Sequence, residues 1–195
     1  MGVAEAEVRF RSGVESQRDV TIVRGRGARI WDDRGREYID CVAGHGAANT
    51  GHCHPAVVEA VRQQVDRLIV CSTVFGNDVR ARLLERLIAV APAGLNRAFL
   101  ANSGTEAVEA ALKFARLSTG RAGIIAARQG FHGRTMGALS ATWEPHYRQP
   151  YEPLVPGFQH VPYNDLTALE AAIGDGTAAV ILEPIPATLG MPLPP

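Results

Sequence analysis

Apolar residues recur at helical spacing in the stretch that follows Pro55. The positions concerned are Val57, Val58, Val61, Val65 and Leu68. A repeat every three to four residues is typical of an amphipathic helix, and proline suits the first helical turn because its missing N–H has no partner there. The pattern therefore predicts a helix over residues 55–68. The same reasoning predicts helices over residues 78–90, 105–117 and 165–173.

Short runs rich in apolar residues alternate with these helices. They cover residues 98–101, 123–127, 159–161 and 178–182, and each is followed by a polar or proline-containing segment. Strands that alternate with helices along a chain favour a mainly parallel sheet. The predicted fold class is therefore α/β.

The first fifty residues have a different pattern. After an N-terminal arm that we expect to be mobile, residues 21–23 and 29–31 are predicted to pair as a hairpin. The chain continues through a turn rich in Asp and Gly, which supply turn geometry, into residues 37–40. Residues 142–156 contain four prolines and are predicted to be a long irregular connection, of the kind often found at functional sites.

Charge and cysteine content narrow the function classes. Twenty basic residues balance twenty acidic ones, so no electrostatic footprint for nucleic acid or for an anionic membrane is expected. No apolar run approaches the ~20 residues of a membrane helix, and a signal-like start is lacking, so a cytoplasmic location is expected. Cys41, Cys53 and Cys71 show no C-x-x-C spacing, which predicts reduced thiols. We interpret His52 and His54, which flank Cys53, as parts of a structural loop rather than as metal ligands.

The loop after residues 98–101 carries the pattern of a phosphate site. Ser103 and Glu106 have the spacing of a capping box, which predicts a helix start at this loop. The N–H groups of a first helical turn attract anions, and the hydroxyl groups of Ser103 and Thr105 would be additional donors. The alternative is a well-capped helix that binds nothing.

A second loop, Gly130-Phe131-His132-Gly133-Arg134-Thr135, follows residues 123–127. The carboxyl ends of parallel strands meet at one edge of a sheet, so we expect the two loops to converge on one crevice. Phe131 could lie flat against an aromatic ligand and Arg134 could bind a carboxylate. The alternatives are core packing for Phe131 and a solvated charge for Arg134.

Four separated motifs resemble those of the class III pyridoxal-phosphate-dependent aminotransferases. They are Gly51-His52-Cys53-His54-Pro55, Asn102-Ser103-Gly104-Thr105-Glu106-Ala107, the 130–135 loop and Ile181-Leu182-Glu183-Pro184. Residues 38–44, 112–116 and 134–137 look most like the acetylornithine aminotransferases, and in particular the branch that acts on lysine or ornithine precursors held on an amino-group carrier protein. The resemblance extends over nearly the whole chain.

The resemblance implies a role for several residues toward the cofactor, pyridoxal 5'-phosphate. Ser103, Gly104 and Thr105 would hold its phosphate, Phe131 would stack on its pyridine ring, and His132 and Glu183 would also face it. Arg134 would bind the α-carboxylate of the substrate. Residues 38–49 would contribute to the substrate side of the site.

The resemblance also implies a fold and a domain organisation. The fold is that of the fold-type-I PLP-dependent transferases, with a truncated large domain. Residues 1–50 would form an arm and hairpin of the small domain, residues 51–185 a partial cofactor-binding domain, and residues 186–195 an atypical proline-rich tail. In the family's larger sheet, only strands 123–127 and 159–161 are expected to remain adjacent, whereas strands 98–101 and 178–182 would lose their neighbours.

The lysine that pyridoxal phosphate chemistry requires has no suitable candidate in this chain. Pyridoxal phosphate is held as a Schiff base by a lysine, and the only lysine among the 195 residues is Lys113. It lies ten positions after Ser103, which is ~15 Å along a helix, so we interpret it as structural and assign no catalytic residue. The aspartate that pairs with the pyridinium nitrogen is also not found. We expect the chain to match the N-terminal half of a family member, through a frameshift, a truncation or a genuine short product.

The function that the resemblance implies is transamination. An amino group would move between an ω-amino acid derivative, such as acetylornithine or carrier-bound lysine or ornithine, and 2-oxoglutarate, as in arginine and lysine biosynthesis. The implied partners are small-molecule amino acids, an amino-group carrier protein and, in the intact enzyme, a second copy of the chain. Two alternatives stay open: a related 4-aminobutyrate or ornithine aminotransferase or semialdehyde aminomutase, and a non-catalytic product that binds phosphate esters or a complete homologue.

Overall fold

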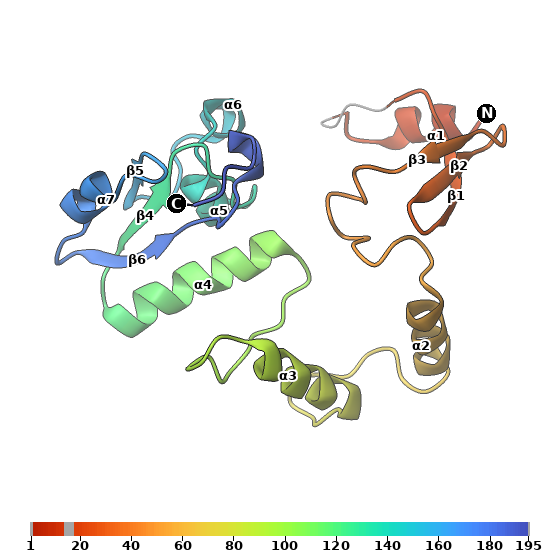
Figure 1. Cartoon of the computed structure of the whole chain (residues 1–195), viewed down its shortest axis with the longest axis horizontal. Coiled ribbons are helices and arrows are strands. Elements are labelled where there is room, and N and C mark those ends of the chain that lie inside the picture. The colour runs from red at the N-terminus through yellow and green to blue at the C-terminus, as the bar shows by residue number, and fades with distance from the viewer. Residues whose placement is uncertain (1, 14–17, 195) are drawn as a thin grey trace. The chain divides into compact units, whose positions relative to one another are not determined.

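The computed structural model describes residues 2–13 and 18–194. It divides into two compact units, Met1–Ala81 and Arg82–Pro195, and the helix α3 (Asp78–Val90) contains the division between them. The units are coloured red to yellow-green and green to blue in Figure 1. The predicted domains 1–50, 51–185 and 186–195 describe the organisation of the complete family fold and stay predictions.

The first unit contains an antiparallel sheet of three strands in the order β1-β2-β3. The strands are β1 (Ile22–Arg26), β2 (Arg29–Asp32) and β3 (Glu37–Ile39). They agree with the hairpin and the following strand that the sequence predicts. Asp32 is 2 % exposed and its carboxylate accepts hydrogen bonds from the N–H groups of Arg34 and Arg36, from Arg36 Nε and from the Tyr38 hydroxyl. One buried side chain thus holds the turn between β2 and β3.

The first unit also contains two helices, α1 (Val3–Phe10) and α2 (Pro55–Val65). The sequence did not predict α1, although Ala and Glu in this segment have high helix propensity. The start of α2 is the predicted one. Its entry loop is tied to the hairpin, since the N–H groups of Gly27 and His52 each donate to the other residue's carbonyl and His52 Nε2 lies 2.6 Å from Asp40 Oδ2.

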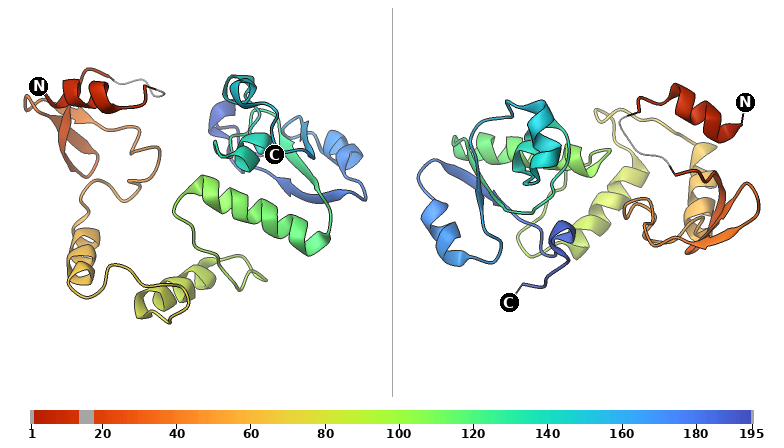
Figure 2. Two further views of the ribbon diagram at one scale, coloured as in Figure 1. Left: turned by 180° about the vertical axis from the view of Figure 1, so that it is seen from behind. Right: turned by 90° about the horizontal axis from the view of Figure 1, so that it is seen from above.

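The second unit is built on a parallel sheet in the order β5-β4-β6. The strands are β4 (Gly123–Ala127), β5 (Phe158–Val161) and β6 (Thr177–Ile181). The helices are α4 (Gly104–Thr119), α5 (Met136–Ala141), α6 (Pro145–Arg148) and α7 (Leu166–Ala172), with 3-10 turns η1 (Gln149–Tyr151) and η2 (Ala187–Leu189). Helix α4 contacts α5 and β6, and α7 contacts β5. These elements are labelled in Figure 1, and α4 (green) and α7 (blue) can be found by colour in Figure 2.

The core of the second unit lies between β4 and α5. Ile124 and Leu139 are almost fully buried, together with Ala126, Ala138 and Ala141. The sequence did not predict α5, because every residue from Gly137 to Ala141 is buried and a helix that is covered on all sides has no amphipathic period. The segment 142–156 is also less irregular than expected, since Pro145 occupies the first turn of α6.

Two expectations about strands are wrong. Residues 98–101 form no strand in the structure, and β6 keeps a neighbour, because it pairs in parallel with β4. The close approach at the start of this pair depends on a residue without a side chain: a Cβ on Gly123 would lie 2.7 Å from the carbonyl oxygen of Gly176. The N–H of Gly123 donates to this same oxygen. None of the described helices is both long and apolar enough to cross a membrane.

Candidate functional site

Ser103 caps the N-terminus of α4. This residue has extended backbone angles, and its Oγ accepts a hydrogen bond from the N–H of Glu106 at 3.3 Å. The Glu106 carboxylate accepts in turn from the N–H of Asn102 at 2.8 Å, one residue before the cap. Burial raises the pKa of Glu106, but these hydrogen bonds outweigh it and leave the pKa below its usual value. The predicted helix start is confirmed, with the return contact displaced by one residue.

The same turn presents backbone donors. Helix geometry leaves the N–H groups of Gly104 and Thr105 without a partner inside the helix, and the positive end of the helix dipole lies behind them. A Cβ on Gly104 would meet no atom within 4 Å. The space beside this residue is therefore open to a ligand.

The loop that follows β4 meets this turn. Thr135 Oγ1 lies 2.8 Å from Thr105 Oγ1, although the two residues are thirty positions apart. Gly133 has a φ of +131°, and a Cβ there would lie 2.3 Å from Thr105 Oγ1, so only glycine permits this approach. The two loops therefore meet, as predicted, although residues 98–101 before the first loop are not the strand that the prediction assumed.

Glu109 connects the two loops and was not singled out from the sequence. Its Oε1 accepts hydrogen bonds from Thr135 Oγ1 at 2.6 Å and from the N–H groups of Gly137 and Ala138 at 2.8 and 3.1 Å. Burial raises the pKa of Glu109, but these donors, helped by the charge of Lys113, hold it below the usual value. The ionised carboxylate thus binds the first turn of α5. The only sequence signal for it is a glutamate one helical turn after Glu106.

Phe131, His132 and Glu183 lie together where β4 and β6 end. Glu183 Oε2 accepts a hydrogen bond from the N–H of Phe131 at 2.8 Å. Phe131 is 37 % exposed as a residue, and its ring packs edge to face against Tyr147 with the ring centres 5.7 Å apart. Part of this ring is therefore available to a ligand, while Glu183 fixes its backbone.

His132 is buried next to this ring. Its backbone N–H donates to Thr142 Oγ1 at 2.9 Å, whereas its ring nitrogen Nε2 has no hydrogen-bond partner among the described residues. Burial lowers the pKa of His132, against the opposing effect of the Glu183 charge. Burial therefore favours the neutral imidazole, and its Nε2 is a buried polar atom that the described residues leave without a hydrogen bond.

Arg134 lies on the 130–135 loop, whereas Lys113 lies on α4 away from this loop. Arg134 is exposed on the loop between Gly133 and Thr135, and Lys113 is exposed on α4, one turn after Glu109. The structure thus brings Ser103, Gly104 and Thr105 close to the 130–135 loop. It leaves Lys113 further along the helix.

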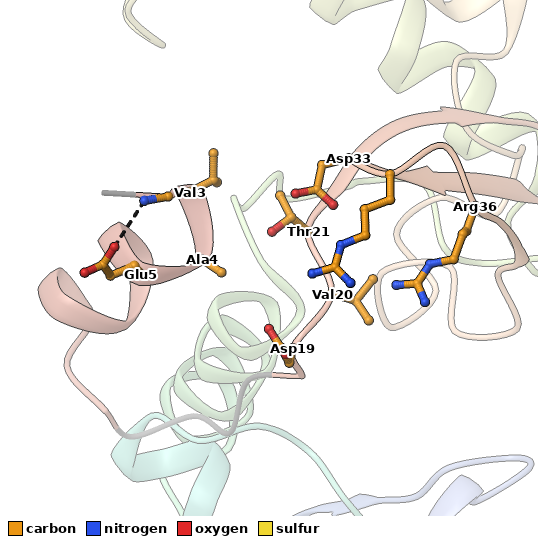
Figure 3. A pocket seen from close by; sticks show the side chains of 10 residues that line it. Val3, Ala4, Glu5, Asp19, Val20, Thr21, Asp33 and Arg36 are labelled. Carbon is orange, nitrogen blue, oxygen red and sulfur yellow. Dashed lines mark hydrogen bonds between the residues drawn. The ribbon is translucent and has the colours of Figure 1, made fainter.

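A cavity of about 340 Å³ lies in the first unit (Figure 3). It is lined by residues of α1, by the segment before β1 and by the turn that holds Asp33, Arg34 and Arg36. None of the site residues predicted from the sequence lines it. Among residues 2–13 and 18–194, no group of three or more His, Cys, Asp or Glu side chains could hold a metal ion.

Comparisons with a family model and with curated proteins point to the same family. A family model described as Aminotransferase class-III matches residues 12–195. The acetylornithine aminotransferase of Methanopyrus kandleri is 54% identical over 195 residues, which is 100% of this chain and 50% of that relative. The LysW-aminoadipate semialdehyde transaminase of Deinococcus radiodurans is 50% identical over 182 residues, which is 92% of this chain and 42% of that relative.

Solved structures support the fold. The ornithine aminotransferase from Toxoplasma gondii, crystallised with partial occupancy of PLP at its active site, superposes with a TM-score of 0.86 and is 32% identical. The match covers 98% of this chain and 46% of that structure. The chain thus has an α/β aminotransferase fold and spans about half the length of the curated relatives it matches.

Proposed function

This chain belongs to the class III aminotransferases, and we propose that the protein moves an amino group between an ω-amino acid derivative and 2-oxoglutarate by means of pyridoxal 5'-phosphate. The ω-amino derivatives proposed are acetylornithine and carrier-bound lysine or ornithine. Relatives named acetylornithine aminotransferase and LysW-aminoadipate semialdehyde transaminase support this choice. The proposal includes a homodimer and an amino-group carrier protein as partners.

The observation that carries the proposal is the junction of the α4 turn with the 130–135 loop. A dianionic phosphate would fit the N–H groups of Gly104 and Thr105, because they point out of a helix start and nothing lies within 4 Å of a Cβ on Gly104. The Ser103 hydroxyl, which accepts from Glu106, still has its own proton to donate. These residues would hold the phosphate of the cofactor.

The remaining residues would position the ring and the substrate. Phe131 would stack on the pyridine ring with its exposed part, and Glu183 would hold the Phe131 backbone in place through the hydrogen bond to its N–H. The buried Nε2 of His132, which has no hydrogen-bond partner among the described residues, would bind a polar group close to the ring if that group reached it. Arg134, whose fork suits a carboxylate, would bind the substrate.

Pyridoxal phosphate, when bound, would supply an electron sink for the proton transfer at the substrate α-carbon or ω-carbon. The described residues would contribute binding and orientation. The lysine that moves the proton has no candidate near these loops, because Lys113 lies on α4 one turn beyond Glu109.

The activity is tested with the gene product at its full encoded length. Glutamate formation from 2-oxoglutarate is measured with acetylornithine, carrier-bound lysine, ornithine and 4-aminobutyrate at equal concentration. The highest kcat/KM is expected for acetylornithine or the carrier-bound substrate. A higher value for 4-aminobutyrate or free ornithine would assign the protein to another branch, and no glutamate from any donor would reject transamination.

The position of Lys113 favours a second candidate function. A product that ends at residue 195 would have its only lysine ~15 Å along the helix from the phosphate turn, and such a product would bind phosphate esters or a complete homologue without catalysis. Borohydride reduction of the chain with pyridoxal phosphate, followed by mass spectrometry, tests this function. Reversible binding without a trapped adduct supports it, and a stoichiometric adduct at Lys113 would refute it.

A further inference from the structure

The hydrogen bonds between Glu109, Thr135 and Thr105 have a fixed direction. An ionised carboxylate only accepts hydrogen bonds, so Thr135 donates its hydroxyl proton to Glu109 Oε1 across 2.6 Å. Having given its single proton, Thr135 Oγ1 must accept at 2.8 Å from the hydroxyl of Thr105. The N–H of Thr135 donates back to Thr105 Oγ1 at 3.4 Å, which agrees with this direction.

The direction of the hydrogen bonds decides what Thr105 can offer to a ligand. A threonine hydroxyl has one proton, and the proton of Thr105 is used by Thr135. A phosphate dianion accepts hydrogen bonds but cannot donate them, so the Thr105 hydroxyl is not available to it. This contradicts the simple expectation that the side chain of Thr105 is an additional phosphate donor.

We propose that Glu109 is a positioning residue for the phosphate site, acting through Thr135 to hold the Thr105 hydroxyl away from the ligand and to lock the 130–135 loop onto the first turn of α4. Thr105 would then contribute its backbone N–H alone. The inference rests on the proposed function for the identity of the ligand. The chain of hydrogen bonds from Thr105 through Thr135 to Glu109, called the relay below, does not depend on any ligand.

The ligand test is a double-mutant cycle on the whole chain, with pyridoxal 5'-phosphate as the probe in calorimetric titrations. The variants are Thr105→Val, Thr135→Val and the double variant. Each single change is expected to weaken binding about three- to tenfold, as for the loss of one hydrogen bond. The double variant is expected to weaken binding no more than either single variant does. If the Thr105 hydroxyl touched the phosphate, Thr105→Val would weaken binding further in the Thr135→Val background, and the proposal would be wrong.

Three controls separate a loss of phosphate positioning from a general destabilisation of the site. Thr135→Ser keeps the hydroxyl and is expected to restore the affinity that Thr135→Val loses. Affinity for pyridoxal, which lacks the phosphate, is expected to stay within about twofold in every variant, whereas a parallel loss for both probes would contradict the proposal. Glu109→Gln is expected to weaken phosphate-dependent binding, and Glu170→Gln, an exposed glutamate on α7, serves as its matched control.

A second cycle is measured without ligand. The folded-to-unfolded ratio of the Thr105→Val, Thr135→Val and double variants is determined by urea denaturation, and coupling between the two positions is expected because they share a hydrogen bond. Additive effects would refute the relay whether or not the chain binds the cofactor. If the relay is coupled but the wild-type chain binds neither pyridoxal phosphate nor inorganic phosphate, the failure lies in the proposed function.

Discussion

At the scale of single residues, Ser103 has two separable roles. Its Oγ caps α4 by accepting from the N–H of Glu106, and the proposed function adds donation to a phosphate. Ser103→Ala is expected to lower the free energy of unfolding by ~1 kcal/mol and to weaken phosphate binding. Ser103→Asp keeps a capping oxygen but brings a negative charge beside the phosphate.

The two Ser103 variants are compared by urea denaturation and by titration with pyridoxal phosphate. Ser103→Asp is expected to be close to wild type in stability and to lose binding more completely than Ser103→Ala. Binding by Ser103→Asp as tight as that of the wild type would place the phosphate elsewhere.

The buried carboxylate of Asp32 makes the first unit sensitive to acid. Burial raises the pKa of Asp32, but hydrogen bonds from Arg36, Tyr38 and Arg34 outweigh it and lower the pKa from 3.8 to about 2. A pKa that is lower in the folded state stabilises that state above the unfolded pKa, and the gain disappears as the pH falls through the folded value. The hairpin is therefore expected to lose this stability between about pH 4 and pH 2.

Fluorescence of Trp31, which lies in β2 directly before Asp32, can follow this loss. In Asp32→Asn the hairpin is expected to be less stable at neutral pH and to change less between pH 4 and pH 2. Asp33→Asn, at an exposed neighbour, is the control that should resemble wild type. An acid transition that is the same in Asp32→Asn and wild type would contradict the assignment.

At the scale of elements, the pairing of β4 with β6 depends on Gly123. A Cβ there would lie 2.7 Å from Gly176 O, so the strands would have to separate. Gly123→Ala is expected to lower the free energy of unfolding of the second unit by about 1–3 kcal/mol, as for other overpacked sites. Gly174→Ala, where a Cβ would meet nothing within 4 Å, is the control, and equal stabilities of the two variants in urea would contradict this account of the pairing.

The elements also show which features the sequence could predict. The Ser103 cap and the starts of α2 and α4 depend on neighbouring residues, so local patterns identify them. The contact between the two loops was predicted from the rule that parallel strands end at one edge, but residues 98–101 form no strand, so the contact depends instead on Thr105 and Thr135. The role of Glu109 and the adjacency of β4 and β6 depend on contacts between distant residues, and the fully buried α5 has no period, so the sequence alone did not reveal them.

At the scale of the whole molecule, the exposed surface is large for the mass of the chain. The accessible area is 14523 Å², whereas two separately folded units of the same total mass would expose about 11,000 Å². Large apolar side chains are exposed in both units, among them Val70 and Val74 in the first and Phe99 in the second. Exposed apolar surface on this scale is typical of interfaces that are covered by a partner or by further chain.

We therefore expect the 195-residue chain to be poorly stable or to self-associate when it is purified alone. Binding of the dye ANS and light scattering that increases with protein concentration measure this. A soluble monomer that unfolds in a single cooperative thermal transition and binds no dye would contradict the expectation.

The central claim is that the first turn of α4 and the 130–135 loop form a phosphate site. NMR titration of the ¹⁵N-labelled chain with pyridoxal 5'-phosphate, and separately with pyridoxal, tests it most directly. The account predicts saturable shifts of the Gly104 and Thr105 amide signals with the phosphate compound and none with pyridoxal. Unchanged signals at these two amides, or identical shifts with both compounds, would contradict it.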